Sequence, residues 1–318
     1  MRSEARIGVV GATGAVGKVT LGLLAGRGYE HVRAFASARS AGSSVAYGPR
    51  SLVVEEATPE ALEAADADVF LFSVGTSASR ELVPAAVSGG AVAIDKSSAY
   101  RLADGVPLVV PEVNGDRAVE HDGIVANPNC CTIPLTCALD PLREAAGLAR
   151  VRVATYQSMS GAGAESMERL RAQSHEELDL LMEWDFDGEE FDEEEKIRLE
   201  TQKILELPEL PVSANCVRVP VLVGHAETVW VETEERLAPE HARELLAASP
   251  AVDLEEFPSP AKAVARGDRV LVGRVRRDPT AENGLVLFLA CDNLNKGAAL
   301  NAIQIAELLL ERRALAAA

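Results

Sequence analysis

The sequence predicts an α/β protein with two domains, one built on a doubly wound parallel sheet and one α+β domain built on a mixed or antiparallel sheet. Its 318 residues suit two domains at roughly 150 residues each. Before about residue 150, short apolar runs alternate with helical stretches. After it, longer runs alternate apolar and polar residues. The first sequence pattern is typical of a parallel sheet covered on both faces. The second pattern is typical of strands that are exposed on one face.

The elements follow in order along the chain. In the first half, apolar runs predict buried strands at 5–11, 32–37, 69–74 and 91–95. Helices are predicted between them at 14–25, 59–65 and 80–88. In the second half, strands are predicted at 151–159, 217–223, 229–233 and 285–290, followed by an amphipathic helix at 295–313.

Charge and cysteine content exclude several classes of protein. The net charge of −18 argues against partners such as nucleic acid or an anionic membrane, both of which need basic surface. Twelve of the acids lie in residues 176–195, which hold no Lys or Arg, and we expect a solvated segment there.

Five cysteines, two of them adjacent, favour reduced thiols and a cytoplasmic location. No apolar run is long enough for a membrane span, and no histidine pair has metal-ligand spacing.

A glycine-rich turn joins the first strand to the first helix. Gly11, Gly14 and Gly17 form GxxGxxG, which lets a pyrophosphate approach the N–H groups at a helix start. The alternative is that the turn has a purely structural role.

The second strand ends in Ser37-Ala38-Arg39-Ser40 without the acid that commonly holds the ribose of NAD. A Rossmann-type domain binding NADP is therefore favoured, unless Arg39 is simply an exposed loop residue.

Cys130 is the candidate nucleophile. It precedes a predicted helix, whose dipole would lower the pKa of the thiol and whose N–H groups could hold an oxyanion. The alternative is that Cys130 is only a small buried residue.

His225 is the candidate base. It lies seven residues after Arg218, so an unbroken strand would put the two side chains on opposite faces. Pro220 and Gly224 are where a bend could bring them together.

Seven strings in order resemble the aspartate-semialdehyde dehydrogenase family over nearly the whole chain. They are GATGAVG at 11–17, ASARSAG at 36–42, VPLVVPEVN at 106–114, NPNCCTI at 127–133, TYQSMSGAG at 155–163, CVRVPVLVGH at 216–225 and DNLNKGAA at 292–299. The resemblance implies an NADP-dependent enzyme that converts L-aspartyl 4-phosphate to L-aspartate 4-semialdehyde, on the route to lysine, threonine and methionine. It also implies a homodimer, with a dinucleotide-binding domain at 1–129 plus 296–318 and a catalytic and dimerisation domain at 130–295.

The resemblance also implies roles for individual residues, according to the family positions that they match. The resemblance implies Cys130 as nucleophile, His225 as acid/base and Gln157 as the residue that positions the acyl group. It implies Arg101, Asn129 and Lys203 near the substrate phosphate, and Glu200 and Arg218 at the amino group and α-carboxylate. From spacing alone, Glu200 and Lys203 read as a surface ion pair. The implied cofactor-binding residues are Gly11, Thr13, Gly14, Ala15, Val16, Gly17, Ser37, Arg39, Ser40, Ser160, Gly161 and Asn293.

Two departures from the family pattern stand out. The segment before Glu200 is shorter than in the family, and the acidic run 176–195 stands where a segment that helps build the subunit contact is expected. Cys131 replaces the usual Ser or Thr after the nucleophile. Two alternatives follow: a related reductase acting on a different acyl phosphate or thioester, or a non-catalytic paralogue. The charges at Glu200, Arg218 and Lys203 argue against the first, and the presence of Cys130 and His225 argues against the second.

Overall fold

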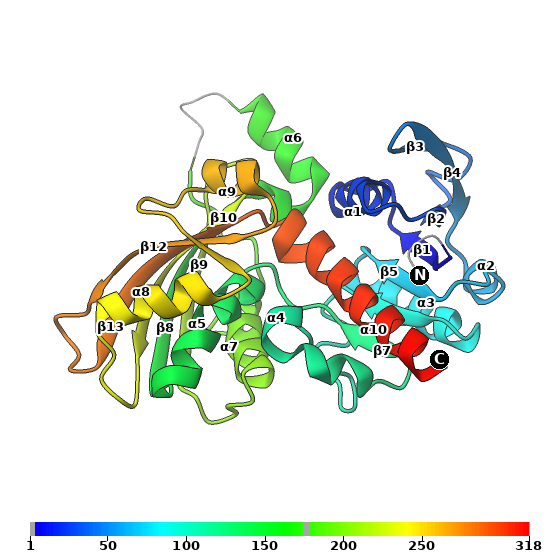
Figure 1. Ribbon diagram of the computed structural model, residues 1–318. Helices are drawn as coiled ribbons and strands as arrows, with labels where there is room; N and C mark the ends of the chain where they lie inside the picture. Colours follow the sequence, from blue (N-terminus) through cyan, green and yellow to red (C-terminus); the bar gives the residue numbers. More distant parts are fainter. Residues whose placement is uncertain (1–3, 174–178, 318) are drawn as a thin grey trace. The chain divides into compact units, whose positions relative to one another are not determined.

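The computed structural model describes residues 4–173 and 179–317, and the chain divides into two compact units (Figure 1). The first unit comprises residues 1–128 and 298–318, and the second comprises residues 129–297. The boundaries expected from the sequence, after 129 and before 296, lie one and two residues from these positions. No helix in the described part of the chain is both long enough and apolar enough to cross a bilayer.

The first unit is built on a seven-stranded sheet. In spatial order its strands are β3 (Ser44–Tyr47), β4 (Arg50–Glu56), β2 (His31–Ala36), β1 (Arg6–Val10), β5 (Val69–Phe72), β6 (Val92–Asp95) and β7 (Ile124–Ala126). Neighbours pair in parallel except β3 with β4. The predicted parallel sheet is confirmed. The β3–β4 hairpin was not predicted, because the edge strand β3 has only four residues and β4 beside it is mostly exposed or half-buried.

Helices cover both faces of this sheet. The core on one face holds Val9 of β1 with residues from α1 (Ala15–Gly26) and α10 (Asn301–Ala317). The core on the other face holds Val10 with residues from α2 (Pro59–Glu63) and α3 (Thr76–Ser88). Successive residues of a strand point to opposite faces, so both are buried. The short helix α4 (Pro111–Asn114) and a 3-10 turn at Gly115–Val119 lie before β7.

The second unit is built on a six-stranded mixed sheet. Its strands are, in spatial order, β11 (Val252–Leu254), β12 (Val270–Arg277), β13 (Gly284–Cys291), β10 (His225–Glu232), β8 (Arg150–Gln157) and β9 (Val212–Arg218). β11–β12 and β8–β9 are parallel, and the other pairs are antiparallel. Its helices are α5 (Thr132–Ala146), α6 (Ala164–Ala172), α7 (Asp192–Ile204), α8 (Pro239–Ala248) and α9 (Pro260–Arg266). α5 packs against both α7 and α8.

The predicted strand at 217–223 is wrong. β9 ends at Arg218 and the chain then leaves the sheet, because Pro220 has no N–H for a ladder and Gly224 takes φ +96°. His225 begins the separate strand β10. β8 lies between β9 and β10, parallel to one and antiparallel to the other. The end of β8, the end of β9 and the start of β10 therefore meet at one edge of the sheet.

Candidate active site

Cys130 and His225 face each other within the second unit. Cys130 lies in the turn before α5, and its Sγ is 3.2 Å from His225 Nε2. His225 is fully buried at the start of β10, whereas Cys130 is partly exposed. A thiol within hydrogen-bond reach of an imidazole is the arrangement that activates a cysteine nucleophile. The structure thus brings together the nucleophile and base proposed from the sequence.

The hydrogen bonds of His225 determine where its proton lies. The backbone N–H of Ser158 donates to Nδ1 at 3.0 Å, so Nδ1 accepts. In neutral imidazole the other nitrogen then carries the hydrogen. Nε2–H of neutral His225 therefore points at Cys130 Sγ. This proton stabilises a thiolate at Cys130, and it can stabilise an oxyanion that forms beside the sulfur.

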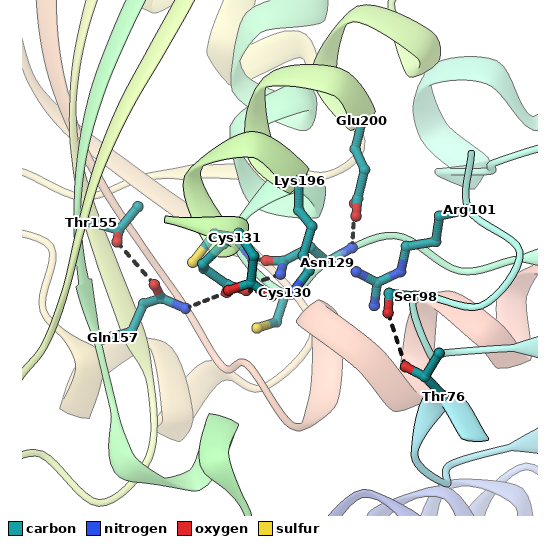
Figure 2. A network of polar contacts seen from close by, with 12 residues as sticks. Thr76, Ser98, Arg101, Asn129, Cys130, Cys131, Thr155, Gln157, Lys196 and Glu200 are labelled. Carbon is teal, nitrogen blue, oxygen red and sulfur yellow. Dashed lines mark hydrogen bonds and ion pairs between the residues drawn. The ribbon is translucent and has the colours of Figure 1, made fainter. Parts of the chain in front are cut away.

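Asn129 shapes the turn that presents Cys130. Its side-chain Oδ1 accepts the N–H of Cys131 at 2.8 Å, and its carbonyl accepts the N–H of Ile133 at 3.1 Å. Its own N–H donates to Glu200 Oε2 at 2.6 Å (Figure 2). The N–H groups of Cys131 and Ile133 are thus engaged within the turn. The expectation that the N–H groups at this helix start are available for an oxyanion does not extend to these two.

Gln157 reaches the same site from the end of β8. Its Oε1 accepts from Thr155 Oγ1 at 3.1 Å, and its Nε2 donates to Glu193 Oε1 at 2.9 Å (Figure 2). Glu193 Oε1 also accepts from Asn129 Nδ2 at 2.9 Å. One buried carboxylate therefore orients both amide side chains.

Glu193 was not among the site residues predicted from the sequence. The expectation that residues 176–195 are solvated is wrong for Glu193 and its neighbour Glu194. Glu193 and Glu194 are 7% and 6% exposed. Glu194 accepts from the N–H groups of Cys216 at 2.8 Å and Phe191 at 3.0 Å. Lys196 Nζ lies 3.7 Å from Glu193 Oε2. Both acids begin α7, and its inner face turns them away from water.

The pattern Glu-x-x-Lys occurs twice in α7, at Glu193/Lys196 and again seven residues later at Glu200/Lys203. Residues seven apart share one helix face, about 10 Å apart along the axis. The family resemblance implies substrate roles for the second copy. In the structure the first contacts Gln157 and Asn129, while Glu200 holds the Asn129 backbone. The repeated pattern is the sequence signal that could have indicated Glu193. Only the packing of α7 shows which of the two glutamates contacts Gln157.

Arg218 is a buried cation beside the His225 loop. It is 4% exposed, and its Nη1 donates to the Ser158 carbonyl at 2.9 Å. A Cβ added to Gly161 would lie 3.1 Å from Arg218 Nη1 and 3.3 Å from His225 Nε2. Glycine at 161 therefore lets the backbone pass close to both side chains. The bend predicted between Arg218 and His225 brings both to Ser158.

Asn293 and Ser160 hold this loop from the other side. Asn293 is 2% exposed, and its Oδ1 accepts from the Gly224 N–H at 2.8 Å and from the hydroxyls of Ser158 and Ser160. Its Nδ2 donates to Ser160 Oγ at 2.9 Å. In the second unit, then, the Asn293 amide fastens the loop that carries His225. Its expected role at the nicotinamide remains a prediction.

Arg101 belongs to the first unit. Its Nε donates to the Asn127 carbonyl at 3.1 Å and its Nη2 to the Lys96 carbonyl at 2.7 Å. Arg101 is 9% exposed. These bonds orient the guanidinium from the loop that follows β6. Its expected contact with substrate phosphate remains a prediction.

The glycine turn of the first unit fits a dinucleotide. Gly11 has φ +83°, and an added Cβ would lie 2.3 Å from the Ser73 carbonyl oxygen. A Cβ on Gly17 would lie 2.1 Å from the Gly11 carbonyl oxygen. Gly14 caps α1 without a side-chain bond, and the first turn, with Ala15 and Val16, holds no acid. The helix start is open to an anionic group, as pyrophosphate binding requires.

The loop after β2 supplies polar groups next to this turn. Ser37 and Arg39 are exposed, and Ser40 Oγ accepts from Thr13 Oγ1 at 3.4 Å. The Ser40 N–H donates to the Ser37 carbonyl at 2.8 Å, which folds the loop back. The arginine and hydroxyls suit a ribose 2′-phosphate, so the residues present fit NADP.

Two buried acids lie behind the nucleophile. Burial raises the pKa of Cys131 well above its ordinary value, and contact with Cys130 raises it further. Burial also raises the pKa of Glu227 well above its ordinary value, with a further rise from Cys130 and an opposing effect of Cys131. Cys131 is thus a buried thiol rather than a second nucleophile.

Comparisons with known proteins identify two family domains in the chain. The semialdehyde dehydrogenase NAD-binding domain matches residues 6–121, and the semialdehyde dehydrogenase dimerisation domain matches residues 139–183 and 181–296. The two dimerisation matches meet inside the acidic segment, which marks where the chain departs from the family pattern.

Whole-chain relatives point the same way. The chain is 41% identical to aspartate-semialdehyde dehydrogenase of Bacillus subtilis, covering 95% of this chain and 96% of that one. It is 42% identical to the Corynebacterium glutamicum enzyme, covering 96% and 99%. The crystal structure of aspartate semialdehyde dehydrogenase II from Vibrio cholerae matches with a TM-score of 0.91 at 36% identity, covering 96% and 98%. The chain belongs to the aspartate-semialdehyde dehydrogenase family.

Proposed function

We propose that the protein is an NADP-dependent aspartate-semialdehyde dehydrogenase that reductively dephosphorylates L-aspartyl 4-phosphate to L-aspartate 4-semialdehyde. The observation that carries the proposal is the 3.2 Å approach of Cys130 Sγ to His225 Nε2 at a sheet edge that also presents Gln157 and Arg218. The relatives named for this reaction support it. One Vibrio cholerae neighbour was solved in complex with ASA and a Candida albicans neighbour with NADP, in agreement with the substrate and cofactor proposed.

The chemistry begins at Cys130. Its thiolate attacks the acyl carbon, a C–S bond forms, and the bond to phosphate oxygen breaks with the electron pair leaving on phosphate. The nicotinamide cofactor supplies a hydride to the resulting thioester. His225 Nε2–H donates a hydrogen bond first to the thiolate and then to the oxyanion. Collapse of the oxyanion reforms a carbonyl and returns the electron pair to Cys130 as thiolate, while the departed phosphate takes up one proton from solvent.

Charged groups of the second unit would hold the amino-acid part of the substrate. Arg218 pairs with the α-carboxylate, and Glu193 accepts from the amino group, in the place first given to Glu200. Glu193 Oε1 already accepts two amide N–H groups, so the amino group would be met by Oε2, the oxygen that lies 3.7 Å from Lys196 Nζ. A related substrate whose amino group is acetylated carries no positive charge there, so it would give the Glu193 carboxylate no cation to bind. In the second unit, Asn129, Lys203 and Lys196 would meet the phosphate, and the phosphate contact implied for Arg101 of the first unit stays a prediction.

The first unit would hold the cofactor. Gly11, Gly14 and Gly17 admit the pyrophosphate, and Arg39 with its neighbouring hydroxyls binds the 2′-phosphate. We further propose a homodimer formed through the second unit, because the dimerisation domain of the family matches there. A cytoplasmic location is proposed from the five free cysteines, which suit a reducing compartment.

The reverse reaction tests the proposal. Purified protein is mixed with L-aspartate semialdehyde, inorganic phosphate and NADP, and NADPH absorbance is followed. We expect turnover with NADP, far less with NAD, and none with Cys130→Ala. Absence of turnover by the unaltered protein, or full activity of Cys130→Ala, would overturn the proposal.

A further inference from the structure

The acidic segment crosses the end of β9 at Arg218. Leu181 and Arg218 form an antiparallel bridge, with N–H to carbonyl distances of 2.9 and 2.8 Å in the two directions. We call residues 179–191 the strap. This bridge fixes the next residues of the strap, Glu183 and Trp184, beside the Arg218 side chain. The strap contains the residues 181–183 at which the two matches to the family dimerisation domain meet.

Two strap side chains enclose the Arg218 guanidinium. Glu183 Oε2 lies 3.5 Å from Arg218 Nε, and its other oxygen pairs with Arg169 of α6. The Arg218 guanidinium carbon lies 4.9 Å from the centre of the Trp184 ring. A cation stacked on an indole and paired with a carboxylate is stabilised from two directions.

The strap is held in this position by its own aromatic side chains. Phe191, at the start of α7, lies 5.0 Å from Phe186 and 6.4 Å from Trp184, ring centre to ring centre. Phe186 and Phe191 also form a backbone bridge, and Asp187 Oδ1 accepts from the N–H groups of Glu189 and Glu190 in the turn between them. The strap is therefore a small hairpin rather than a chain that lies over Arg218 at random.

Burial explains why Arg218 carries a counter-ion. Its side chain is 5% exposed, and a buried unpaired charge is costly. Within residues 4–173 and 179–317, Glu183 is the acid that forms an ion pair with it. The Glu183 side chain is 29% exposed and its Oε2 lies 3.5 Å from Arg218 Nε, so the carboxylate keeps contact with water and the ion pair is long. A long and hydrated pair is readily exchanged for a carboxylate that fits Arg218 better.

We propose that Glu183 is an internal competitor for the substrate α-carboxylate. It neutralises Arg218 in the free enzyme and is displaced when the substrate carboxylate takes its place, while Trp184 remains as the wall of that subsite. The strap thereby sets the affinity for substrates that carry an α-carboxylate. This inference rests on the proposed function, in which Arg218 binds that group.

Removal of the competing charge provides the test. In Glu183→Gln, Arg218 keeps its stacking on Trp184 but has no anion to release, so the KM for L-aspartate semialdehyde falls by about two- to fivefold. The kcat does not change, because Glu183 does not contact Cys130 or His225. Glu189→Gln is the matched control, since it removes the same charge from an exposed position in the same strap. Its KM stays at the value of the unaltered enzyme.

A second substrate separates competition from a general effect on the pocket. Beta-aminopropionaldehyde has the aldehyde and the amine but no carboxylate, so Glu183→Gln does not lower its KM. An unchanged or higher KM for aspartate semialdehyde in Glu183→Gln, or an equal fall for both aldehydes, would overturn the inference while leaving the proposed function intact. Lack of turnover by the unaltered enzyme would instead refute the proposed function.

Discussion

Ser158 orients both His225 and Arg218. Its backbone N–H donates to His225 Nδ1 at 3.0 Å, and its carbonyl accepts from Arg218 Nη1 at 2.9 Å. One peptide segment thus sets the tautomer of the imidazole and the direction of the cation. Because Ser158 directly follows β8, the sheet itself fixes both groups.

Loss of the imidazole should act on turnover rather than on binding. In His225→Ala, the Nε2–H that faces Cys130 is lost, and kcat falls by about 10²-fold or more while KM changes little. Steady-state kinetics of the reverse reaction measure both constants. A variant with normal kcat would show that His225 takes no part in the chemical steps.

Glu193 should affect the reaction more than an exposed acid of the same helix. Glu193→Gln weakens the acceptor shared by Asn129 and Gln157 and removes the charge proposed to meet the amino group. A charge-assisted bond contributes about 1.5–3 kcal/mol, so kcat/KM falls by about 10- to 100-fold. Glu195→Gln, on an exposed position of the same helix, is the control and keeps normal kinetics. Equal losses in both variants would argue for a general charge effect.

Gly161 should tolerate no side chain. The added Cβ of Gly161→Ala would lie 3.3 Å from His225 Nε2 and 3.1 Å from Arg218 Nη1, so one of them must shift. We expect kcat/KM to fall by about tenfold or more, because small displacements of catalytic groups are costly. Gly22→Ala is the control, since its Cβ meets no atom within 4 Å. Full activity of Gly161→Ala would show that the loop can move freely.

Glu227 should make stability depend on pH. Its pKa is raised in the folded protein, so the folded state binds more protons than the unfolded state above the ordinary value of about 4.5. The unfolding free energy therefore falls as pH rises from 4.5 toward the raised pKa, by about 1.4 kcal/mol per pH unit. Glu227→Gln lacks this dependence. Urea denaturation at several pH values above 4.5 should show the variant gaining on the unaltered protein as the pH rises, and parallel curves would contradict the prediction.

Arg39 should discriminate between the two nicotinamide cofactors. Arg39→Ala removes the exposed cation proposed to meet the 2′-phosphate, so the KM for NADP rises by about 10-fold or more. The KM for NAD, which has no such phosphate, stays unchanged. Parallel assays with the two cofactors measure the ratio, and an equal change for both would place Arg39 outside the 2′-phosphate site.

Much of the first unit could be predicted because its signals are local. A buried parallel strand such as Arg6–Val10 reads as an apolar run, and Gly11 marks the turn after it. The β3–β4 hairpin carries no such run, because an edge strand is half exposed. The predicted strand at 217–223 failed for a related reason. Apolar residues continue past Arg218, and only Pro220 and Gly224 hinted that the strand ends.

Contiguous strings in the sequence predict the α/β class, the candidate nucleotide turn, Cys130 as candidate nucleophile and the family resemblance. Tertiary structure alone decided which Glu-x-x-Lys pair meets Gln157, where the His225 proton lies, and that Glu183 pairs with Arg218. These depend on contacts between residues far apart in sequence. The acidic segment shows the difference. Its charge predicts solvation, but packing turns Glu193 and Glu194 inward, where backbone and amide donors compensate their loss of water.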